Sequence, residues 1–229
     1  MTSDRVVRVL LKPVLFAAAL TPIVWLAWSV YTGNLGADPL ADVTHETGAW
    51  ALRFLCATLA VTPVRRLTGW NRLTRFRRML GLFAFFYATV HLLIYAGADR
   101  LAGLDLSNGI LSLQTAVALA KSVVDDVRKR PFITAGFTAW ACMLPLALTS
   151  TAGWIRRLGG RRWNLLHRLI YLSAVAACVH YYWLVKSDIR RPLAYGAVVV
   201  LLLGFRIVWS RVNRRVSIPQ PATSQRSLR

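Results

Sequence analysis

The sequence is poor in charged residues and in cysteine. Only 17% of its 229 residues are charged and 56% are hydrophobic, whereas a soluble domain carries about 25% charged residues. This composition argues against a large soluble core and favours a membrane protein. The three cysteines, Cys56, Cys142 and Cys178, lie apart in apolar runs without a CxxC pair. We therefore predict neither a disulfide framework nor a zinc site, and interpret the cysteines as small core residues.

The sequence also lacks a glycine-rich phosphate loop, internal repeats and the length for a soluble flavin or nicotinamide domain. Any such reductant must bind elsewhere or belong to a separate protein. The net charge of +20 would suit nucleic acid, but the basic residues lie between and at the ends of apolar runs. Because no separate basic domain with interleaved aromatic residues is present, we predict membrane lipid and not nucleic acid as a partner.

Long apolar runs dominate the sequence and predict an all-α membrane protein. The whole chain, 1–229, is interpreted as one domain, with its helix bundle within about 10–210 and a disordered polar tail at 216–229. Six runs have about the length that a helix needs to cross a bilayer. We place these six transmembrane helices near 14–31, 47–63, 77–97, 132–150, 163–185 and 192–210.

Basic residues set the predicted orientation, because cytoplasmic segments of membrane proteins carry an excess of Lys and Arg. With the N-terminus in the cytoplasm, the inner segments hold more than twice as many basic residues as the outer ones. Six spans then leave both termini in the cytoplasm. The longest connection, 98–131, would lie outside. Within it we expect Leu111 to Val127 to form an amphipathic helix on the outer surface, with a re-entrant segment as the alternative.

Three of the four histidines, His91, His167 and His180, lie inside the predicted spans. An imidazole in hydrocarbon is costly unless something binds it, so each is a functional-site hypothesis. His91 and His180 lie at similar depths in the outer half, on spans that run in the same direction. Since facing helices can supply axial ligands from opposite sides of a haem, we predict that they bind one haem iron. The alternative is two histidines hydrogen-bonded to neighbouring helices.

His167 is predicted to share a helix with His180, roughly 20 Å closer to the cytoplasm at about 1.5 Å per residue. Its counterpart on the third span is Arg78 and not a histidine. Three interpretations stay open for His167: a ligand of an inner haem with a different partner, a residue lining a quinone or flavin site, or an interfacial residue beside Arg168.

Three further residues are singled out. Arg53, about two turns into the second span, is predicted to pair with a haem propionate or to extend its charge to the surface. Arg206 near the inner end of the sixth span is predicted to extend to the surface. His45 is interpreted as a solvated residue at a helix start.

Several stretches resemble one known family. The sequence contains HETGAWAL, RFRRMLGLFAFFYATVHLLIY, DDVRKRPFITAGFTAW, LALTSTAGW and RRWNLLHRLIYLSAVAACVHYYW. These resemble the MsrQ family, also called YedZ, whose members are haem-binding membrane subunits of the protein-methionine-sulfoxide reductase system. The family lies within the ferric-reductase-like transmembrane group. The resemblance covers residues 10 to about 210.

The resemblance implies an electron-transfer subunit in the bacterial inner membrane, with one or two b-type haems held by His91, His167 and His180. It would pass electrons from the quinone pool or a cytoplasmic flavin reductase to MsrP, a periplasmic molybdopterin enzyme that repairs oxidised methionine. FMN is also associated with the family, although no residue here identifies an FMN site. Ferric reductases carry paired histidines on both helices, and the missing second histidine on the third span opposes a two-haem arrangement.

Two other functions stay open. One is a self-sufficient transmembrane ferric or quinone reductase that acts on small molecules at the outer face. The other is a transporter or assembly factor with structural histidines, which the absence of inverted repeats and of paired broken helices disfavours. Whether the chain is itself an enzyme or only a subunit of an oxidoreductase system stays open as well.

Overall fold

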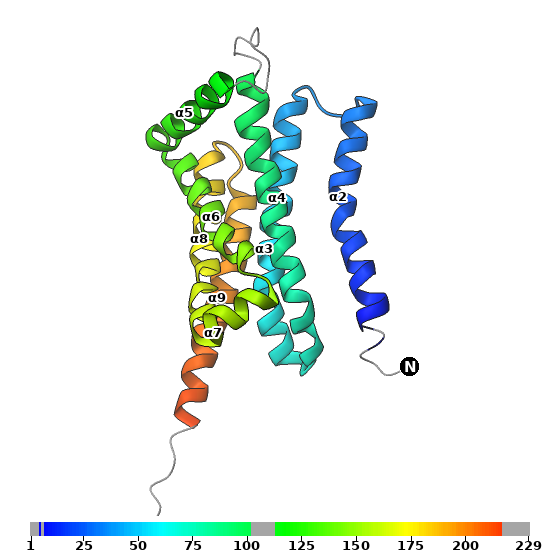
Figure 1. The fold of residues 1–229 in the computed structure, drawn as a ribbon, viewed down its shortest axis with the longest axis vertical. Coiled ribbons are helices and arrows are strands. Elements are labelled where there is room, and N and C mark those ends of the chain that lie inside the picture. The colour runs from blue at the N-terminus through cyan, green and yellow to red at the C-terminus, as the bar shows by residue number, and fades with distance from the viewer. Residues whose placement is uncertain (1–4, 6, 102–112, 217–229) are drawn as a thin grey trace, which may run out of the picture.

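The computed structural model describes residues 5, 7–101 and 113–216. These residues are built from helices without a strand, which confirms the all-α prediction (Figure 1). In chain order the elements are the π-helix η1 (Val7–Leu11), α2 (Lys12–Thr32), α3 (Pro39–Thr68), the 3-10 helix η2 (Asn71–Leu73), α4 (Thr74–Leu101), α5 (Leu113–Lys129), α6 (Pro131–Leu148), α7 (Ala152–Leu166), α8 (Leu169–Leu184) and α9 (Arg190–Val216).

Local sequence signals set where several helices begin and end. The Asp38 side chain accepts a hydrogen bond from the Ala41 N–H (3.0 Å) at the start of α3, so it satisfies an amide that has no partner within the helix. Gly33 and Gly69 end α2 and α3 with φ values of 69° and 71°. Glycine adopts this left-handed conformation without a side-chain clash, which explains the sharp turns after both helices.

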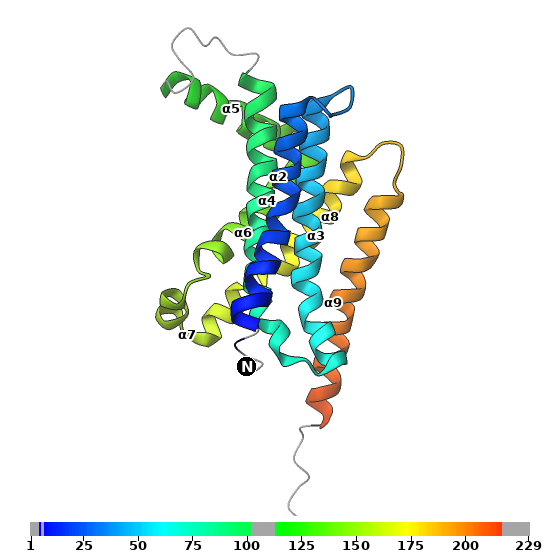
Figure 2. The same cartoon turned by 90° about the vertical axis from the view of Figure 1, so that its right-hand side faces the viewer.

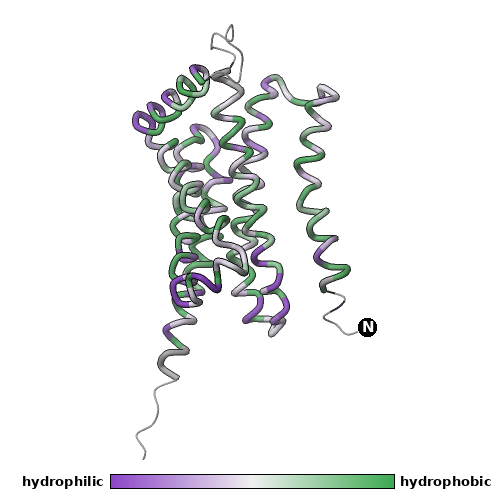
Figure 3. The backbone as a smooth tube through the Cα atoms, in the orientation of Figure 1, coloured by the Kyte–Doolittle hydropathy of each residue, from purple (hydrophilic) through white to green (hydrophobic). Residues whose placement is uncertain are grey.

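Two tightly packed helix pairs form the bundle. α3 lies along α4, α6 lies along α8, and α9 packs against α3 and α8. The core between them contains side chains that are almost fully buried, including Leu55, Leu59, Ala84, Tyr87 and Ala174. Hydrophobic residues run along the helices, whereas hydrophilic residues gather at α7 and at the turn between α3 and α4 (Figure 3).

Among the described residues, five helices are long and apolar enough to cross a membrane, namely α2, α3, α4, α6 and α9. The predicted count of six is not confirmed, because α8 has only 16 residues. At about 1.5 Å per residue it is about 24 Å long, shorter than a hydrocarbon core of about 30 Å. α2 nevertheless begins and α9 ends at the same end of the bundle (Figures 1 and 2).

The predicted fifth span is divided between two helices. α7 ends at Leu166 and α8 begins at Leu169, so the prediction that His167 and His180 share one helix is wrong. Bonds of the i to i−3 type join Arg168 N to Leu165 O (3.1 Å) and Tyr171 N to Arg168 O (2.9 Å). They replace the regular helical bonds at this point and tighten the chain into a turn.

The long connection contains the expected amphipathic helix. α5 runs across the end of the bundle instead of along it (Figures 1 and 2). We refer to this end as the α5 end and to the opposite one as the α7 end. The start of the predicted helix at Leu111 lies outside the described residues, as does the predicted tail from 217 onward. Val216 still belongs to α9.

Buried polar side chains complete the backbone hydrogen bonding near two prolines. Arg206 donates to Leu59 O (2.8 Å), to Thr62 Oγ1 (3.1 Å) and to the Tyr171 hydroxyl (2.8 Å). Leu59 O lies four residues before Pro63, which has no N–H to offer it. The prediction that Arg206 extends to the surface is therefore wrong, because its guanidinium ties α9 to α3.

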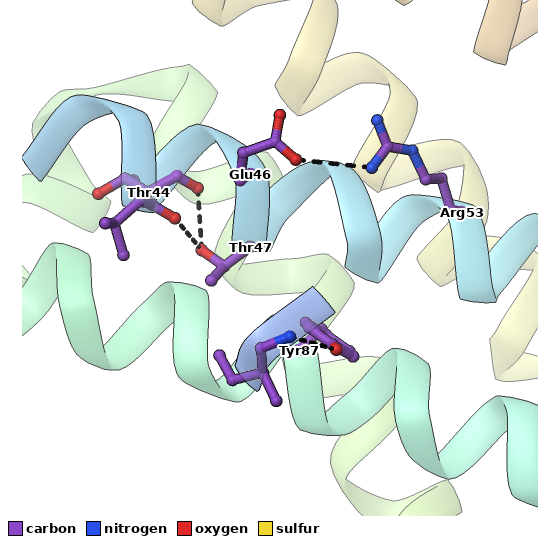
Figure 4. Close-up of polar contacts among 7 residues, drawn as sticks. Thr44, Glu46, Thr47, Arg53 and Tyr87 are labelled. Atoms are coloured by element: carbon purple, nitrogen blue, oxygen red, sulfur yellow. Dashed lines mark hydrogen bonds and ion pairs between the residues drawn. The ribbon is translucent and has the colours of Figure 1, made fainter. Parts of the chain in front are cut away.

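The second such contact joins α4 to α2. The Tyr87 hydroxyl accepts a hydrogen bond from Ile23 N (3.2 Å; Figure 4). It also donates to Ala19 O (2.8 Å), so that its two partners lie on either side of Pro22 in the sequence. A side chain inserted into a helical ladder in this way supplies the partners that the proline-containing turn lacks. The first helix is thus attached to the bundle through a specific polar contact.

Candidate functional site

A cavity of about 830 Å³ lies between the two helix pairs at the α5 end. Its walls come from α3, α4, α6 and α8, with contributions from α9 and, through Val123 and Val127, from α5. Most of its lining residues are apolar. This volume falls within the range of about 300–1,000 Å³ that is typical of cofactor and small-molecule sites.

His91 of α4 and His180 of α8 meet in this cavity. Their ring centroids are 6.1 Å apart and their planes form an angle of 73°. A metal bound by one nitrogen of each ring, at about 2.0–2.1 Å per bond, would hold the two centroids roughly 6 Å apart. The structure therefore brings together the pair that the sequence singled out, at a separation that suits one metal ion between them.

Each of the two rings is tied to a backbone carbonyl of a neighbouring helix. His91 Nδ1 lies 2.9 Å from Thr44 O, and His180 Nδ1 lies 2.7 Å from Phe132 O. A carbonyl only accepts, so Nδ1 carries the hydrogen and the lone pair resides on Nε2. Within the described residues Nε2 of neither ring has a hydrogen-bond partner. A bond of this kind fixes the tautomer and orientation of a metal-binding histidine.

A glycine lies against each ring. A β-carbon at Gly48 would lie 3.1 Å from His91 Nδ1 and Cε1, and one at Gly136 would lie 2.8 Å from His180 Nδ1. Each glycine follows its hydrogen-bonding carbonyl by four residues and so lies on the same face of its helix, one turn along. The pairs α3–α4 and α6–α8 thus present the same arrangement. The two segments, THETG and FITAG, share only the glycine when they are aligned position by position.

Arg53 lines the same cavity, together with Arg191 of α9. The Arg53 guanidinium lies 3.6 Å from the Glu46 carboxylate (Figure 4). It also lies 4.5 Å from the centroid of the Trp50 ring. Arg53, the predicted partner of a haem propionate, therefore lies at the cavity, where its guanidinium already faces the Glu46 carboxylate. Glu46, Trp50 and Arg191 were not singled out in the sequence.

His45 also lines the cavity, but its side chain is exposed. Its exposure agrees with the interpretation of a solvated residue. Its place at a helix start is wrong, because α3 begins at Pro39 and His45 lies in the second turn. In the part of the chain that the structure describes, no three His, Cys, Asp or Glu side chains gather to hold a metal ion. The cavity instead offers the facing pair of rings.

His167 lies away from this cavity, at the end of α7. Its ring stacks on Trp163 with centroids 3.7 Å apart, and its Nδ1 lies 3.0 Å from Trp163 O. Nε2 is buried and has no hydrogen-bond partner among the described residues. His167 is thus held by its own helix, and no other histidine faces it.

Comparison with known proteins identifies the family. Residues 47–178 match the family described as "Ferric reductase like transmembrane component". The chain is 48% identical over 223 residues to the "Protein-methionine-sulfoxide reductase heme-binding subunit MsrQ" of Xanthomonas euvesicatoria pv. vesicatoria strain 85-10, covering 93% of this chain and 94% of that one. The chain belongs to the MsrQ family.

Other MsrQ proteins are similarly close. The one from Xanthomonas campestris pv. campestris strain 8004 is 47% identical with the same coverage. The one from Herminiimonas arsenicoxydans is 45% identical over 207 residues, covering 90% of this chain and 88% of that one. No solved structure matches the chain.

The ferric-reductase match covers most of the cavity. It includes Gly48, His91, Gly136 and His167, and ends two residues before His180. The resemblance to the MsrQ family is thus confirmed. The carbonyl contacts of Thr44 and Phe132 could not be read from the sequence, because a backbone carbonyl leaves no residue-type signal. Glycine within a helical segment is a sign that another group approaches the backbone closely, and Gly48 and Gly136 carried that sign.

Proposed function

We propose that this chain is the haem-binding, electron-transferring membrane subunit of a methionine-sulfoxide reductase system, with a b-type haem held between His91 and His180. The observation that carries the proposal is the geometry of these two rings. They lie next to each other in a mostly apolar cavity, each with Nδ1 tied to a carbonyl and Nε2 without a hydrogen-bond partner among the described residues. The printed name of the related MsrQ proteins, a heme-binding subunit, supports the same cofactor.

The residues present fit a haem. A haem macrocycle fills the equatorial positions of its iron, so the protein supplies ligands only above and below. Two facing imidazoles meet that need without a larger ligand cluster. Arg53 and Arg191 offer positive charge to the propionates, although Arg53 must then share its guanidinium with Glu46. When bound, haem would supply the one-electron chemistry.

We propose six membrane crossings in a bacterial inner membrane, with the short helix α8 as the fifth crossing, α9 as the sixth, and both termini in the cytoplasm. An even number of crossings agrees with α2 beginning and α9 ending at the same end. The turn after α3 and the α7 helix are rich in arginine, whereas the acidic side chains Asp38, Asp42, Glu46, Asp125, Asp126 and Asp188 lie at the α5 end. The α7 end would therefore face the cytoplasm. Topology reporters should signal cytoplasm at Gly69 and periplasm at Asp188, and the reverse pattern would reject this orientation.

We further propose that electrons enter at the cytoplasmic α7 end, from quinol or a flavin reductase. They leave from the cavity to a periplasmic molybdopterin methionine-sulfoxide reductase of the MsrP type. The location of the cavity at the α5 end supports delivery to the periplasm. His167, at the α7 end, is the proposed residue near which electrons enter, as an inner haem ligand or as part of the donor site. No described residue indicates an FMN site, so the proposal rests on haem.

A second candidate is a self-sufficient reductase of ferric iron or quinone at the outer face. The match to the ferric-reductase-like family favours it. The two candidates differ in the acceptor: the first needs a protein partner, whereas the second transfers electrons directly to a small molecule.

The test begins with the chain purified from bacterial membranes. Haem is quantified per chain and a reduced-minus-oxidised spectrum is recorded. We expect at least one haem per chain with a low-spin, bis-histidine spectrum. A folded chain without haem would reject the proposal and favour a transporter or assembly factor.

The reduced protein in nanodiscs is then mixed with the oxidised periplasmic reductase, and in parallel with a ferric chelate or a quinone. Rapid reoxidation by the periplasmic reductase, and not by the ferric chelate or the quinone, supports the electron-transfer subunit. Reoxidation by the small molecules but not by the protein would favour the self-sufficient reductase.

A further inference from the structure

His91 and His180 each belong to a unit of three parts: a histidine, a carbonyl that holds its Nδ1, and a glycine on which the ring lies. In the first unit α3 supplies Thr44 O and Gly48, and in the second α6 supplies Phe132 O and Gly136. Both carbonyl and glycine come from the helix that packs most closely against the histidine-bearing helix. The ring is thereby fixed against a neighbouring backbone and not only by its own side-chain torsions.

The glycines are required by space. A β-carbon at Gly136 would meet three atoms of the His180 ring at 2.8, 3.0 and 3.0 Å, which are closer than van der Waals contact allows. At Gly48 the closest approach would be 3.1 Å to the His91 ring. The ring would have to move away in both cases, by more at Gly136. Because the Nδ1 bond is only 2.7–2.9 Å long, this movement would lengthen or break it.

We propose that Gly48 and Gly136 are positioning residues that set the orientation of the two axial histidines. Each lets its ring approach the neighbouring backbone closely enough to bond the carbonyl one turn away. This inference rests on the proposed haem site between the two rings. The two units together produce the angle of 73° between the ring planes, and the Nδ1 bonds raise the basicity of Nε2 toward a bound iron.

A displaced ring should therefore change the resonance signal and the reduction potential of the haem, while the same two histidines still bind it. The angle between axial imidazole planes affects the splitting of the iron d orbitals, which electron paramagnetic resonance of the oxidised protein reports. The hydrogen bond on Nδ1 affects the reduction potential, because it controls the electron density that the ligand donates. A purely structural glycine would alter neither quantity in the folded, haem-loaded protein.

The experiment uses the full chain purified with its haem, as the variants Gly136→Ala and Gly48→Ala. Gly196→Ala and Gly204→Ala in α9 are matched controls, because nothing lies within 4 Å of a β-carbon at either position. For Gly136→Ala we expect about tenfold weaker haem retention, the low end of the cost of losing an outer-shell partner, together with a shifted resonance signal and midpoint potential. For Gly48→Ala we expect full haem content with smaller shifts in the same two quantities. The controls should match the parent chain.

Unchanged resonance signal and potential in a haem-loaded Gly136→Ala chain would overturn the inference. If Gly136→Ala yields no folded chain, the resonance signal and potential of Gly48→Ala test the inference instead, because the β-carbon added at Gly48 requires a smaller shift of the ring. Identical spectra and potentials in Gly48→Ala and the two controls would then reject the inference. A parent chain without bis-histidine haem would instead reject the proposed function, so the two failures are distinguishable.

Discussion

At the α5 end of the bundle a neighbouring helix holds each histidine ring, whereas at the α7 end His167 is held by its own helix. The Nδ1 partners of His91 and His180 lie 47 and 48 residues away in sequence. The partner of His167 is Trp163 O, four residues away. A contact between helices points a ring into the space that the helices share. A contact within one helix leaves the ring stacked on that helix.

The difference teaches that the backbone of a neighbouring helix decides whether a histidine ring points into the space between helices. A carbonyl and an adjacent glycine on the next helix are present for both rings at the α5 end. At the α7 end the aromatic face of Trp163 occupies one side of His167. The predictions below test this contrast between the two ends.

The largest effect is expected at the α5 end. His91→Ala or His180→Ala leaves the proposed iron with one axial imidazole, so the low-spin bis-histidine spectrum should be lost or greatly reduced. Absorption spectra of the purified variants measure this. His45→Ala is the control, since this exposed residue lines the same cavity but the two rings bond Thr44 O and Phe132 O and not His45. Parent-like spectra in both the His91 and the His180 variants would eliminate the assignment.

A smaller effect on the spectrum is expected at the α7 end. His167→Ala should leave the His91–His180 spectrum intact but slow its reduction by quinol or by a flavin reductase, because His167 lies at the proposed entry side. Stopped-flow reduction in nanodiscs compares it with Asn164→Ala, an exposed change on the same helix. Loss of the His91–His180 spectrum in His167→Ala would contradict the independence of the two ends.

The stability of the α7 end should depend on Arg206 and not on a cofactor. Arg206→Met leaves Leu59 O beside Pro63 without its donor, and an unsatisfied buried carbonyl costs about 1–3 kcal/mol. Thermal unfolding in detergent should therefore begin at a lower temperature, while the spectrum of the folded fraction stays the same. Arg211→Met, at an exposed position of the same helix, is the control. Equal stability of the two variants would contradict this role.

The smallest effect is expected for Tyr87→Phe. This change removes the hydroxyl that bonds Ala19 O and Ile23 N but keeps the buried ring, at a cost of about 1 kcal/mol. Hydrogen exchange at Ile23 should become faster, with Tyr182→Phe, an exposed change, as the control. Protection of Ile23 equal to that in the parent chain would indicate that Pro22 is accommodated without this hydroxyl.

The sequence predicted the helices and the facing pair because both depend on residue type and spacing. Apolar runs gave the α2, α3, α4, α6 and α9 helices to within a few residues at most ends, and depth counting gave His91 and His180. The break at His167 was missed because the run 163–185 is mostly apolar and contains neither glycine nor proline to mark an end.

The details of the site could not be predicted because they depend on packing between helices. The distance from His180 to Phe132 O is a property of how α6 and α8 lie together, and no residue type encodes a carbonyl. Similarly, the sequence shows Arg206 only as a charge near the inner end of the sixth span. In the structure it donates to Leu59 O, the carbonyl that Pro63 leaves without a donor. Long-range partners of this kind are specified by the whole fold.

The contact between Tyr87 and α2 has a consequence for biosynthesis. The Tyr87 hydroxyl bonds a carbonyl that was made 68 residues earlier. At about 5–20 residues per second, the ribosome needs roughly 3–14 s to add that length of chain. During that interval the helical turn at Pro22 has been synthesised but the hydroxyl that bonds it has not. Final docking of α2 against α4 can therefore follow only after Tyr87 has been translated.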